Sequence, residues 1–405
     1  MTDHLLSNNQ NLENGLSLIN DSTNENVIKV LLDPQIFMSQ KVGGVSRQFV
    51  EVWQHLHDYS EIQISCPLLF SENYHLETSG VSLKGPLTIL HHRQFRGISR
   101  IKGKLFNLSE YYCKKILSSK KTDIFLPTFY NPYFINSLNG TPFVLSVFDM
   151  IYELFPQYFP PGLIMVQNKK KLLYKSTRII VHSIQTKKDL LKFYPDLDTS
   201  KIDLVHLASS VGLQNEMVNS TSNFSHPYLL YVGRRDTYKN FPFFLQAVKD
   251  LLIGKKLHLI CTGGDPFSES EILLIKALNL EDVVFQKDIS AQELPLVYKH
   301  ARAFIFPSEY EGFGLPVLEA MACGCPVVLA DNGVFREIGG EAALYFDLNN
   351  EQMLKHRIEQ VLEDESLRKS LIKKGFEREK QFSWELTAKG YYNSILKALK
   401  YNIAE

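Results

Sequence analysis

The chain has 405 residues, and its 44 Lys and Arg residues balance 44 Asp and Glu residues. This length allows two domains of roughly 100–200 residues each, and the balanced charge gives no reason to expect a nucleic-acid partner. Five cysteines without a CxxC pair favour reduced thiols over a disulfide framework or a zinc site. We interpret Cys323 and Cys325 as small apolar packing residues, with metal binding as the second reading, and we predict no metal site.

The N-terminal segment 1–26 is rich in Asn and Ser, and we predict that it is disordered. It lacks the basic-then-apolar order of a signal peptide. No stretch of the chain approaches the roughly 18 consecutive apolar residues of a membrane-spanning helix. We therefore expect a cytoplasmic protein.

Residues 27–208 are predicted to form a first doubly wound domain. Short apolar runs that end at turn or polar residues are expected to be its strands: 27–33, 62–66, 123–127, 143–149, 178–183 and 201–205. Helical patterns separate most of these runs, as at 47–58 and 164–175. This alternation predicts a parallel sheet that is covered on both faces.

Two features of this domain bear on function. Gly43 and Gly44 follow the first strand and open a helix, but Gly-x-Gly-x-x-Gly is not completed, which disfavours nicotinamide binding. The stretch 91–121 has many Lys and Arg residues, interleaved Phe and Tyr residues, and Glu110 as its single acidic residue. It could lie on an anionic membrane as a basic amphipathic helix. Alternatively, it is a solvated helix whose aromatic residues face the core.

A polar linker without periodicity is predicted at 209–226, before a second doubly wound domain at 227–382. The strands expected in the second domain are 228–233, 256–264, 282–285, 303–307, 326–330 and 343–346. An amphipathic helix, Trp384–Lys400, lies in the final segment 383–405. Two such domains leave a cleft between the carboxyl ends of their strands, where ligands of open α/β sheets bind.

Arg234 and Lys239 follow the first strand of the second domain and are expected to face this cleft. Fixed cations there would stabilise a diphosphate leaving group without a metal; otherwise, they are merely solvated. Gly263 and Gly264 follow the next strand, where they allow close approach to a ligand or simply form the turn.

Residues 306–320, FPSEYEGFGLPVLEA, place Glu311 and Glu319 around a Gly-Phe-Gly turn, and we predict that a helix begins at Pro316. Free amides and the positive end of the helix dipole suit a phosphate, and the carboxylates can accept hydrogen bonds from sugar hydroxyls. The alternative is that the glutamates cap the helix or match its dipole.

The same string, with its continuation at 321–346, resembles the Glu-x7-Glu signature of retaining GT-B glycosyltransferases. The resemblance is to glycosyltransferase family 4, and especially to bacterial surface-polysaccharide mannosyltransferase-like members. It implies an α/β fold of two Rossmann-like domains that face each other across a cleft, with the C-terminal helix crossing back to the first domain.

The resemblance also implies residue roles. Arg234 and Lys239 would hold the diphosphate, Glu319 the ribose hydroxyls and Glu311 the transferred sugar. Residues expected to contact the donor through their backbone are Gly43, Gly44, Gly263, Gly264, Phe313, Gly314 and Leu315. The nucleotide base would lie near residues 286–289.

Residues 143–155 also resemble this family, with one departure. Members usually carry His-Asp beside the donor sugar, whereas this chain has Phe148-Asp149-Met150. Asp149 is counted with Arg234, Lys239 and Glu311 in the expected catalytic set, but not as a nucleophile; at a strand end it could equally cap or orient the loop. His206 could partly substitute for the missing histidine.

The function implied is retaining, metal-independent transfer of a hexose-type sugar, without a cofactor. The donor would be a nucleoside-diphosphate sugar, GDP-mannose-like or a UDP-sugar, and the acceptor a saccharide or lipid-linked molecule of surface-polysaccharide biosynthesis. The protein would work in the cytoplasm, at the inner face of the membrane. Two alternatives stay open: a starch- or sucrose-type glucosyltransferase, and a sugar-nucleotide-binding protein with little turnover, which Phe148 suggests.

Overall fold

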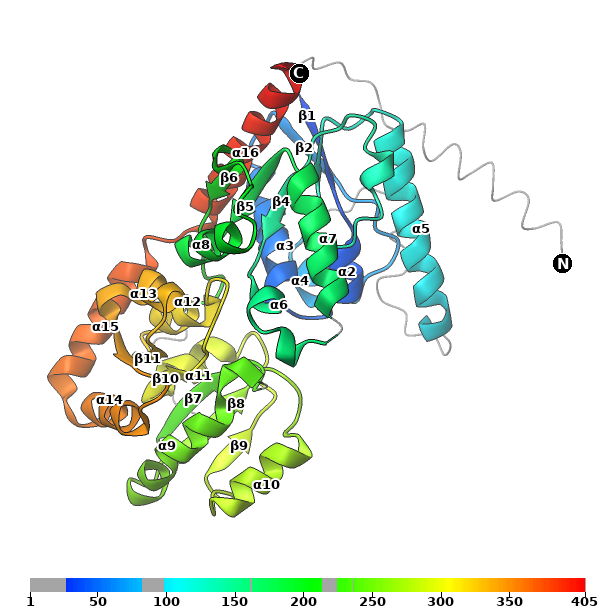
Figure 1. Cartoon of the computed structure of the whole chain (residues 1–405). Helices are drawn as coiled ribbons and strands as arrows, with labels where there is room; N and C mark the ends of the chain where they lie inside the picture. Colours follow the sequence, from blue (N-terminus) through cyan, green and yellow to red (C-terminus); the bar gives the residue numbers. More distant parts are fainter. Residues whose placement is uncertain (1–26, 82–97, 161, 213–223, 236, 405) are drawn as a thin grey trace.

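The computed structural model describes residues 27–81, 98–160, 162–212, 224–235 and 237–404. The predicted disordered segment 1–26 lies outside these residues, as does most of the predicted linker. The described residues form two α/β units (Figure 1). We call the part built on strands β1–β6 the first unit and the part built on β7–β12 the second unit.

The first unit contains two three-stranded parallel sheets in the orders β2-β1-β3 and β4-β5-β6. A parallel bridge between Phe125 and Phe143 joins them into one layer. The six predicted strands are confirmed, with slightly shorter ends: β1 (Ile28–Leu32), β2 (Ile62–Ser65), β3 (Ile124–Leu126), β4 (Val144–Val147), β5 (Arg178–Val181) and β6 (Ile202–Leu204). Its α-helices are α2 (Gln35–Ser39), α3 (Gly44–Leu56), α4 (Tyr74–Thr78), α5 (Ile98–Ser118), α6 (Ile151–Leu154), α7 (Gly162–Lys175) and α8 (Ile184–Phe193).

The second unit contains one six-stranded parallel sheet in the order β12-β11-β10-β7-β8-β9. Its strands are β7 (Tyr228–Val232), β8 (His258–Thr262), β9 (Val284–Gln286), β10 (Ala303–Phe306), β11 (Val327–Ala330) and β12 (Ala343–Phe346). The winding direction reverses between β7 and β10, so ligands are expected beyond the carboxyl ends of these two strands. Its α-helices are α9 (Phe241–Gly254), α10 (Glu269–Ala277), α11 (Leu294–His300), α12 (Leu315–Ala322), α13 (Gly333–Gly339), α14 (Glu351–Glu363) and α15 (Glu365–Glu379).

The last helix, α16 (Trp384–Ala404), connects the two units. At its start, the Trp384 indole N–H donates to the Ser210 hydroxyl at 2.9 Å, and Trp384 packs in the core of the second unit. The helix then runs along α3 and β5 of the first unit (Figure 1). There the buried Tyr391 hydroxyl accepts a hydrogen bond from Gln48 Nε2 at 2.7 Å. The predicted return of the C-terminal helix to the first domain is therefore confirmed.

The cysteines are packing residues. Cys323 and Cys325 are 1% and 2% exposed in the core of the second unit, which confirms their prediction as apolar packing residues. All five cysteines are free thiols. Among the described residues, no helix has both the length and the apolar character needed to span a bilayer.

Candidate functional site

Two of the predicted site residues meet where the winding of the second sheet reverses. Lys239 lies in the short turn after β7, and its ammonium group forms an ion pair with Glu311 Oε1 in the loop after β10. Each side chain is 13% exposed. The fold therefore brings together a cation assigned to a diphosphate and a carboxylate assigned to a sugar, although 72 residues separate them in sequence.

The loop that carries Glu311 is fixed at both ends. The backbone N–H of Glu309 donates to the carbonyl of Tyr238 at 2.8 Å, which ties the loop to the turn after β7. At the other end Gly314 is the N-cap of α12 with φ 92°, a left-handed conformation that favours glycine. The helix consequently begins at Leu315, one residue before the predicted start at Pro316.

Glu319 is buried, with 4% of its surface exposed, and both of its carboxylate oxygens have partners. Oε1 forms an ion pair with Arg47 of the first unit, and Oε2 accepts a hydrogen bond from the Tyr298 hydroxyl at 3.0 Å. Burial, together with the charge of Glu319, holds the pKa of Tyr298 well above its usual range, so this hydroxyl remains a donor. Glu319 lies beyond the first turn of α12, so the helix-capping alternative does not account for it.

The glycine loop of the first unit approaches the same place. A Cβ added to Gly44 would lie 3.6 Å from Leu315 Cδ1, whereas one added to Gly43 would overlap the side chain of Gln40. Gly312 in the second unit is packed still more closely, because its added Cβ would lie 1.9 Å from the carbonyl oxygen of Phe148. The loops after β1, β4 and β10 therefore meet at one junction between the units.

The backbone of Gly263 and Gly264 favours the alternative in which these glycines form the turn after β8, rather than the one in which they allow close approach to a ligand. Their φ angles are +73° and +77°. An added Cβ on Gly263 would lie 3.1 Å from the amide nitrogen of Gly233, and one on Gly264 would lie 3.1 Å from the Cα of Arg234. Both glycines thus let the loops after β7 and β8 pack closely and thereby hold the backbone of Arg234.

Arg234 is exposed at the end of β7 and lies within electrostatic reach of the first unit. Burial raises the pKa of Tyr152, the nearby Asp149 carboxylate raises it further, and the Arg234 guanidinium opposes this rise. Arg234 and Asp149 therefore lie on opposite sides of the same junction. By contrast, the neighbouring Arg235 is 6% exposed and forms an ion pair with Glu271 at 2.8 Å, which gives it a structural role.

Asp149 holds its own loop in shape. Its Oδ1 accepts the backbone N–H of Ile151 at 3.0 Å, and its carbonyl oxygen accepts a hydrogen bond from Lys169 Nζ at 3.0 Å. Lys169 is fully buried and forms an ion pair with Glu153 at 2.9 Å. The sequence analysis missed Lys169, because nothing distinguishes the first lysine of a Lys-Lys-Lys run from its two exposed neighbours.

Phe148 fills an aromatic cluster in the first unit. It is 9% exposed, and its ring lies 6.1 Å from that of Phe49, 5.6 Å from that of Tyr130 and 6.3 Å from that of His182, on which it stacks. The position at which the family resemblance predicts a histidine thus presents an apolar ring. The Phe148 ring packs in the core beside the buried side chain of His182.

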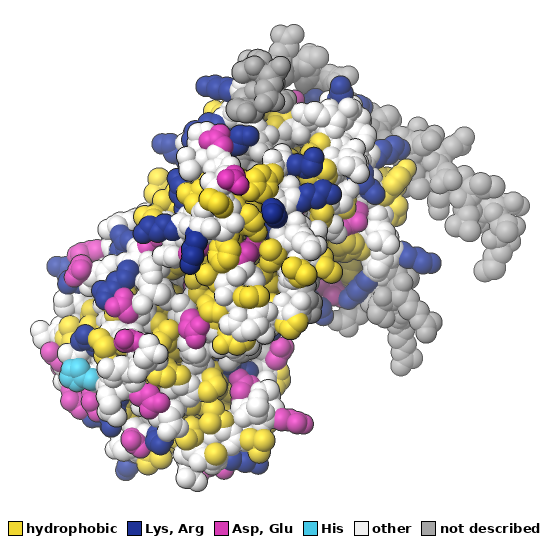
Figure 2. All heavy atoms as spheres, in the orientation of Figure 1, with side chains coloured by type: hydrophobic (Ala, Val, Ile, Leu, Met, Phe, Trp, Pro, Cys, Tyr) yellow, Lys and Arg dark blue, Asp and Glu magenta, His cyan; other side chains and the backbone are white. Residues whose placement is uncertain are grey.

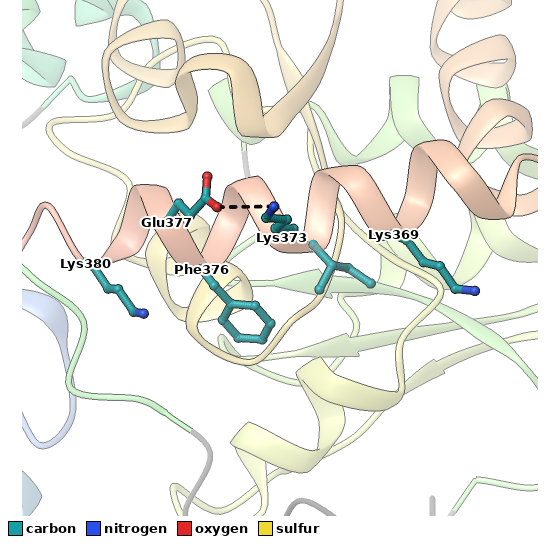
Figure 3. Close-up of a pocket in the computed structure, with 6 residues that line it drawn as sticks. Lys369, Lys373, Phe376, Glu377 and Lys380 are labelled. Atoms are coloured by element: carbon teal, nitrogen blue, oxygen red, sulfur yellow. Dashed lines mark ion pairs between the residues drawn. The ribbon is translucent and has the colours of Figure 1, made fainter.

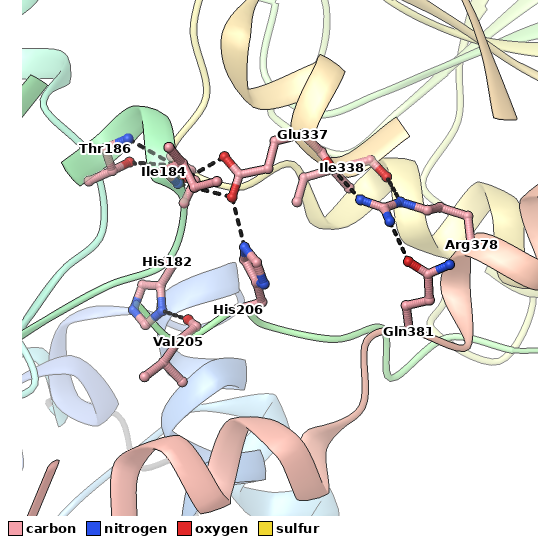
Figure 4. Close-up of polar contacts among 11 residues, drawn as sticks. His182, Ile184, Thr186, Val205, His206, Glu337, Ile338, Arg378 and Gln381 are labelled. Atoms are coloured by element: carbon pink, nitrogen blue, oxygen red, sulfur yellow. Dashed lines mark hydrogen bonds and ion pairs between the residues drawn. The ribbon is translucent and has the colours of Figure 1, made fainter. Parts of the chain in front are cut away.

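His206 takes part in a different contact between the units (Figure 4). Its Nε2 lies 2.7 Å from Glu337 Oε1, and the Glu337 carboxylate also accepts the N–H of Ile184 at 2.8 Å, at the start of α8. The Glu337 carboxylate of α13 thereby caps a helix of the first unit. His206 is engaged in this contact, and nothing in the described structure places it beside Phe148.

His182 is neutral in the folded protein, because burial lowers its pKa to about 4. Its Nδ1 lies 2.8 Å from the carbonyl of Val205 (Figure 4). In the unfolded chain a histidine binds a proton below about pH 6.5. The contribution of His182 to the free energy of unfolding is therefore complete above pH 6.5. It decreases as the pH falls towards 4, by up to about 1.4 kcal/mol per pH unit.

We expect His182→Gln to remove this dependence, so that its stability deficit relative to the wild type shrinks between pH 6.5 and 4.5. Urea unfolding at several pH values checks the prediction. A deficit that stays constant across this range would contradict it.

A shallow hollow on the second unit lies away from these residues. It measures about 390 Å³ and lies along the exposed side of α15 (Figure 3). Its lining includes Lys373, which forms an ion pair with Glu377 at 4.0 Å, and the half-exposed Phe376. None of the predicted site residues lines this hollow, so the junction remains the candidate site.

Comparison with known proteins finds a family match for part of the chain. Residues 214–378 match the model of the family described as "Glycosyl transferases group 1". The chain is 35% identical to "O-antigen chain mannosyltransferase B" of Escherichia coli over 162 residues, which is 39% of this chain and 42% of that protein. The chain spans about half the length of the curated relatives it matches.

Solved structures share the fold over nearly the whole chain. Sucrose-phosphate synthase from Thermosynechococcus elongatus has a TM-score of 0.66 and 19% identity, covering 90% of this chain and 98% of its own. HepE of Anabaena, solved with UDP and glucose, has a TM-score of 0.65 and 14% identity, covering 91% and 99%. The resemblance to GT-B glycosyltransferases and the fold of two Rossmann-like units are confirmed.

Proposed function

We propose that the chain is a retaining glycosyltransferase that moves a hexose-type sugar from a nucleoside-diphosphate sugar to an acceptor, without a metal. The observation that carries this proposal is the Lys239–Glu311 ion pair at the point where the second sheet reverses its winding. A cation and a carboxylate at this point match the two chemical needs of such a donor, a diphosphate and a polyol. The match to the glycosyl transferase family and the name of the mannosyltransferase relative support it.

Donor binding would exchange ion pairs inside the protein for contacts with the ligand. Without donor, Lys239 pairs with Glu311, and Arg47 pairs with Glu319. On binding, the diphosphate would form an ion pair with Lys239 and a second one with Arg234. Glu311, no longer paired with Lys239, would then accept hydrogen bonds from the sugar. Ribose hydroxyls would compete with Arg47 for Glu319. These largely inaccessible charges would thus have partners of opposite charge or hydrogen-bonding partners both before and after the donor enters.

The transfer step needs no protein nucleophile in this scheme. The bond between the anomeric carbon and the phosphate oxygen breaks as the acceptor oxygen attacks from the same face. The acceptor proton passes to an oxygen of the leaving diphosphate. Arg234 and Lys239 would stabilise the charge that develops there. Glu311 is engaged by Lys239, and we assign it to hydroxyl binding rather than to attack.

We propose a saccharide or lipid-linked acceptor of surface-polysaccharide biosynthesis and a reaction on the cytoplasmic side of the membrane. The name of the O-antigen relative supports this pathway, and the five free thiols are compatible with a reducing compartment. A UDP-sugar donor has support from the HepE complex and a GDP-mannose-like donor from the mannosyltransferase relative.

Screening a panel of nucleotide sugars tests the proposal. Thermal shift detects binding, because a ligand that binds the folded state raises its stability, and released nucleoside diphosphate reports turnover. We expect one donor to produce both signals. Binding without turnover across the panel and a range of acceptors would favour the sugar-nucleotide-binding alternative that Phe148 suggests. Absence of binding by every donor would contradict the proposal.

Transfer is expected to continue after a chelator removes divalent cations, because Arg234 and Lys239 supply positive charge at the diphosphate. Initial rates with and without the chelator should agree. A rate that collapses in the chelator and recovers with manganese or magnesium would show that the enzyme depends on a metal.

A further inference from the structure

The outer faces of α7 and α8 combine exposed apolar side chains with lysines. On α7, Leu163 and Ile164 are 64% and 68% exposed. Along the rest of the helix the exposed positions are Gln167, Lys170, Lys171, Tyr174 and Lys175. Their spacing of three and four residues places them all on one stripe of the helix.

Helix α8 lies beside α7 and continues this surface. The strand order β4-β5-β6 with right-handed crossovers puts both helices on the same side of the sheet, and the rings of Tyr174 and Tyr194 are in contact at 6.5 Å. Lys188, Lys192 and Phe193 are exposed on α8. We call the exposed residues of these two helices the α7–α8 face.

The charge of this face has one sign. Between residues 156 and 195 the sequence contains only one acidic residue, Asp189, and its side chain is buried. Among the described residues, none of the five exposed lysines of the face has an ion-pair partner: Lys170, Lys171, Lys175, Lys188 and Lys192. Figure 2 shows hydrophobic and basic side chains next to each other over these helices. In a chain with no net charge, this is a local cationic surface.

We propose that the α7–α8 face docks the protein on an anionic lipid bilayer. Such a surface satisfies both kinds of side chain at once, because lysines can lie among anionic headgroups while apolar side chains enter the acyl boundary. A soluble polyanion would leave Leu163 and Ile164 in water.

Docking on this face would also place the candidate site at the bilayer surface. Helix α7 starts shortly after Phe155, whose ring stacks on that of Tyr238 at 5.7 Å, beside Lys239. The apolar end of α7 therefore lies near the junction. The proposal goes beyond the transfer reaction and does not depend on it.

This face differs from the predicted membrane contact at 91–121. Residues 91–97 of that stretch lie outside the described residues, and the rest is helix α5 with its flanks. Tyr111 is 53% exposed, whereas Phe106 and Tyr112 are half-buried. Helix α5 therefore has features of a membrane-surface helix and also of a solvated helix whose aromatic residues face the core. The experiment must therefore distinguish the two helical surfaces.

Vesicle flotation of the full chain without nucleotide provides the test. We expect binding to vesicles of phosphatidylcholine with about a third phosphatidylglycerol, and little binding to phosphatidylcholine alone. Lys170→Glu with Lys171→Glu should weaken binding at least about twentyfold, at about fivefold for each lysine lost. Leu163→Asp with Ile164→Asp should weaken it at least about tenfold. Acidic residues in a first helical turn are compatible with the helix.

Matched variants control for charge and hydrophobicity. Lys373→Glu with Lys374→Glu on α15 makes the same change in net charge, and Leu273→Asp removes a side chain that is 67% exposed on α10. Both controls should bind like the wild type. If both double variants on α7 bind vesicles like the wild type, the proposal is overturned. It is also overturned if only Lys104→Glu with Lys115→Glu on α5 causes a loss of binding.

A tryptophan at position 163 distinguishes a bilayer from a polyanion. We expect Leu163→Trp emission to shift to shorter wavelength with anionic vesicles and to stay unchanged with heparin. Equal binding to heparin and vesicles without any shift would overturn the bilayer proposal in favour of a soluble polyanion.

Discussion

Replacing Lys239 with methionine is expected to lower kcat/KM for sugar transfer by about 10²–10³-fold, the effect of removing one preorganised group that faces developing charge. Lys239 lies at the end of β7 in an ion pair with Glu311, where the proposed diphosphate would take it over. Steady-state kinetics with the donor found in the panel measures the effect. Lys255→Met is the matched control, because it breaks another lysine–glutamate pair, with Glu363, at the C-terminal end of α9. It should retain activity within about twofold.

The same replacement leaves Glu311 without its partner, and a second variant separates these two effects. Lys239→Met combined with Glu311→Gln removes both charges. If Lys239 acts on the leaving diphosphate, the double variant stays as slow as the single one. Recovery of most of the activity in the double variant would mean that Lys239 only neutralises Glu311.

Replacing Lys169 with methionine is expected to lower the free energy of unfolding by about 3–5 kcal/mol, because it leaves the buried Glu153 carboxylate uncompensated. Both side chains are almost completely inaccessible, and the lysine also holds the carbonyl of Asp149. Urea unfolding measures the change. Lys170→Met on the exposed side of the same helix should change stability by less than about 0.5 kcal/mol.

A combined Lys169→Met and Glu153→Gln variant should recover part of the lost stability, since no buried charge then remains unpaired. A loss below about 1 kcal/mol for the single variant would contradict the account of this ion pair.

The fold was readable from the sequence because its strands are short, continuous apolar runs. Runs such as 303–307 and 326–330 are buried on both faces of a parallel sheet, so burial requires apolar residues at every position. The start of α12 was wrong by one residue, because Gly314 takes the N-cap in a left-handed conformation and Leu315 becomes the first helical residue. Backbone conformation at one glycine is not encoded in a hydrophobic pattern.

The candidate site was predicted only in part. The motif residues Lys239, Glu311 and Glu319 do lie at one junction, but the partners of Glu319 depend on tertiary packing. Arg47 meets Glu319 across 272 residues of sequence, and Tyr298 reaches the same carboxylate from α11. No local pattern marks either contact. The first is created where α3 of the first unit meets α12 of the second, and the other by the packing of α11 on α12 within the second unit.

The central claim is that the junction holds a nucleoside diphosphate with Arg234 and Lys239 on its phosphates. Titration calorimetry with UDP or GDP, beside the corresponding nucleoside, tests it most directly. We predict that Lys239→Ala and Arg234→Ala each weaken diphosphate binding by about 1.5–3 kcal/mol, the value of a charge-assisted hydrogen bond, and leave nucleoside binding unchanged. Equal losses for the nucleoside and its diphosphate would contradict the account.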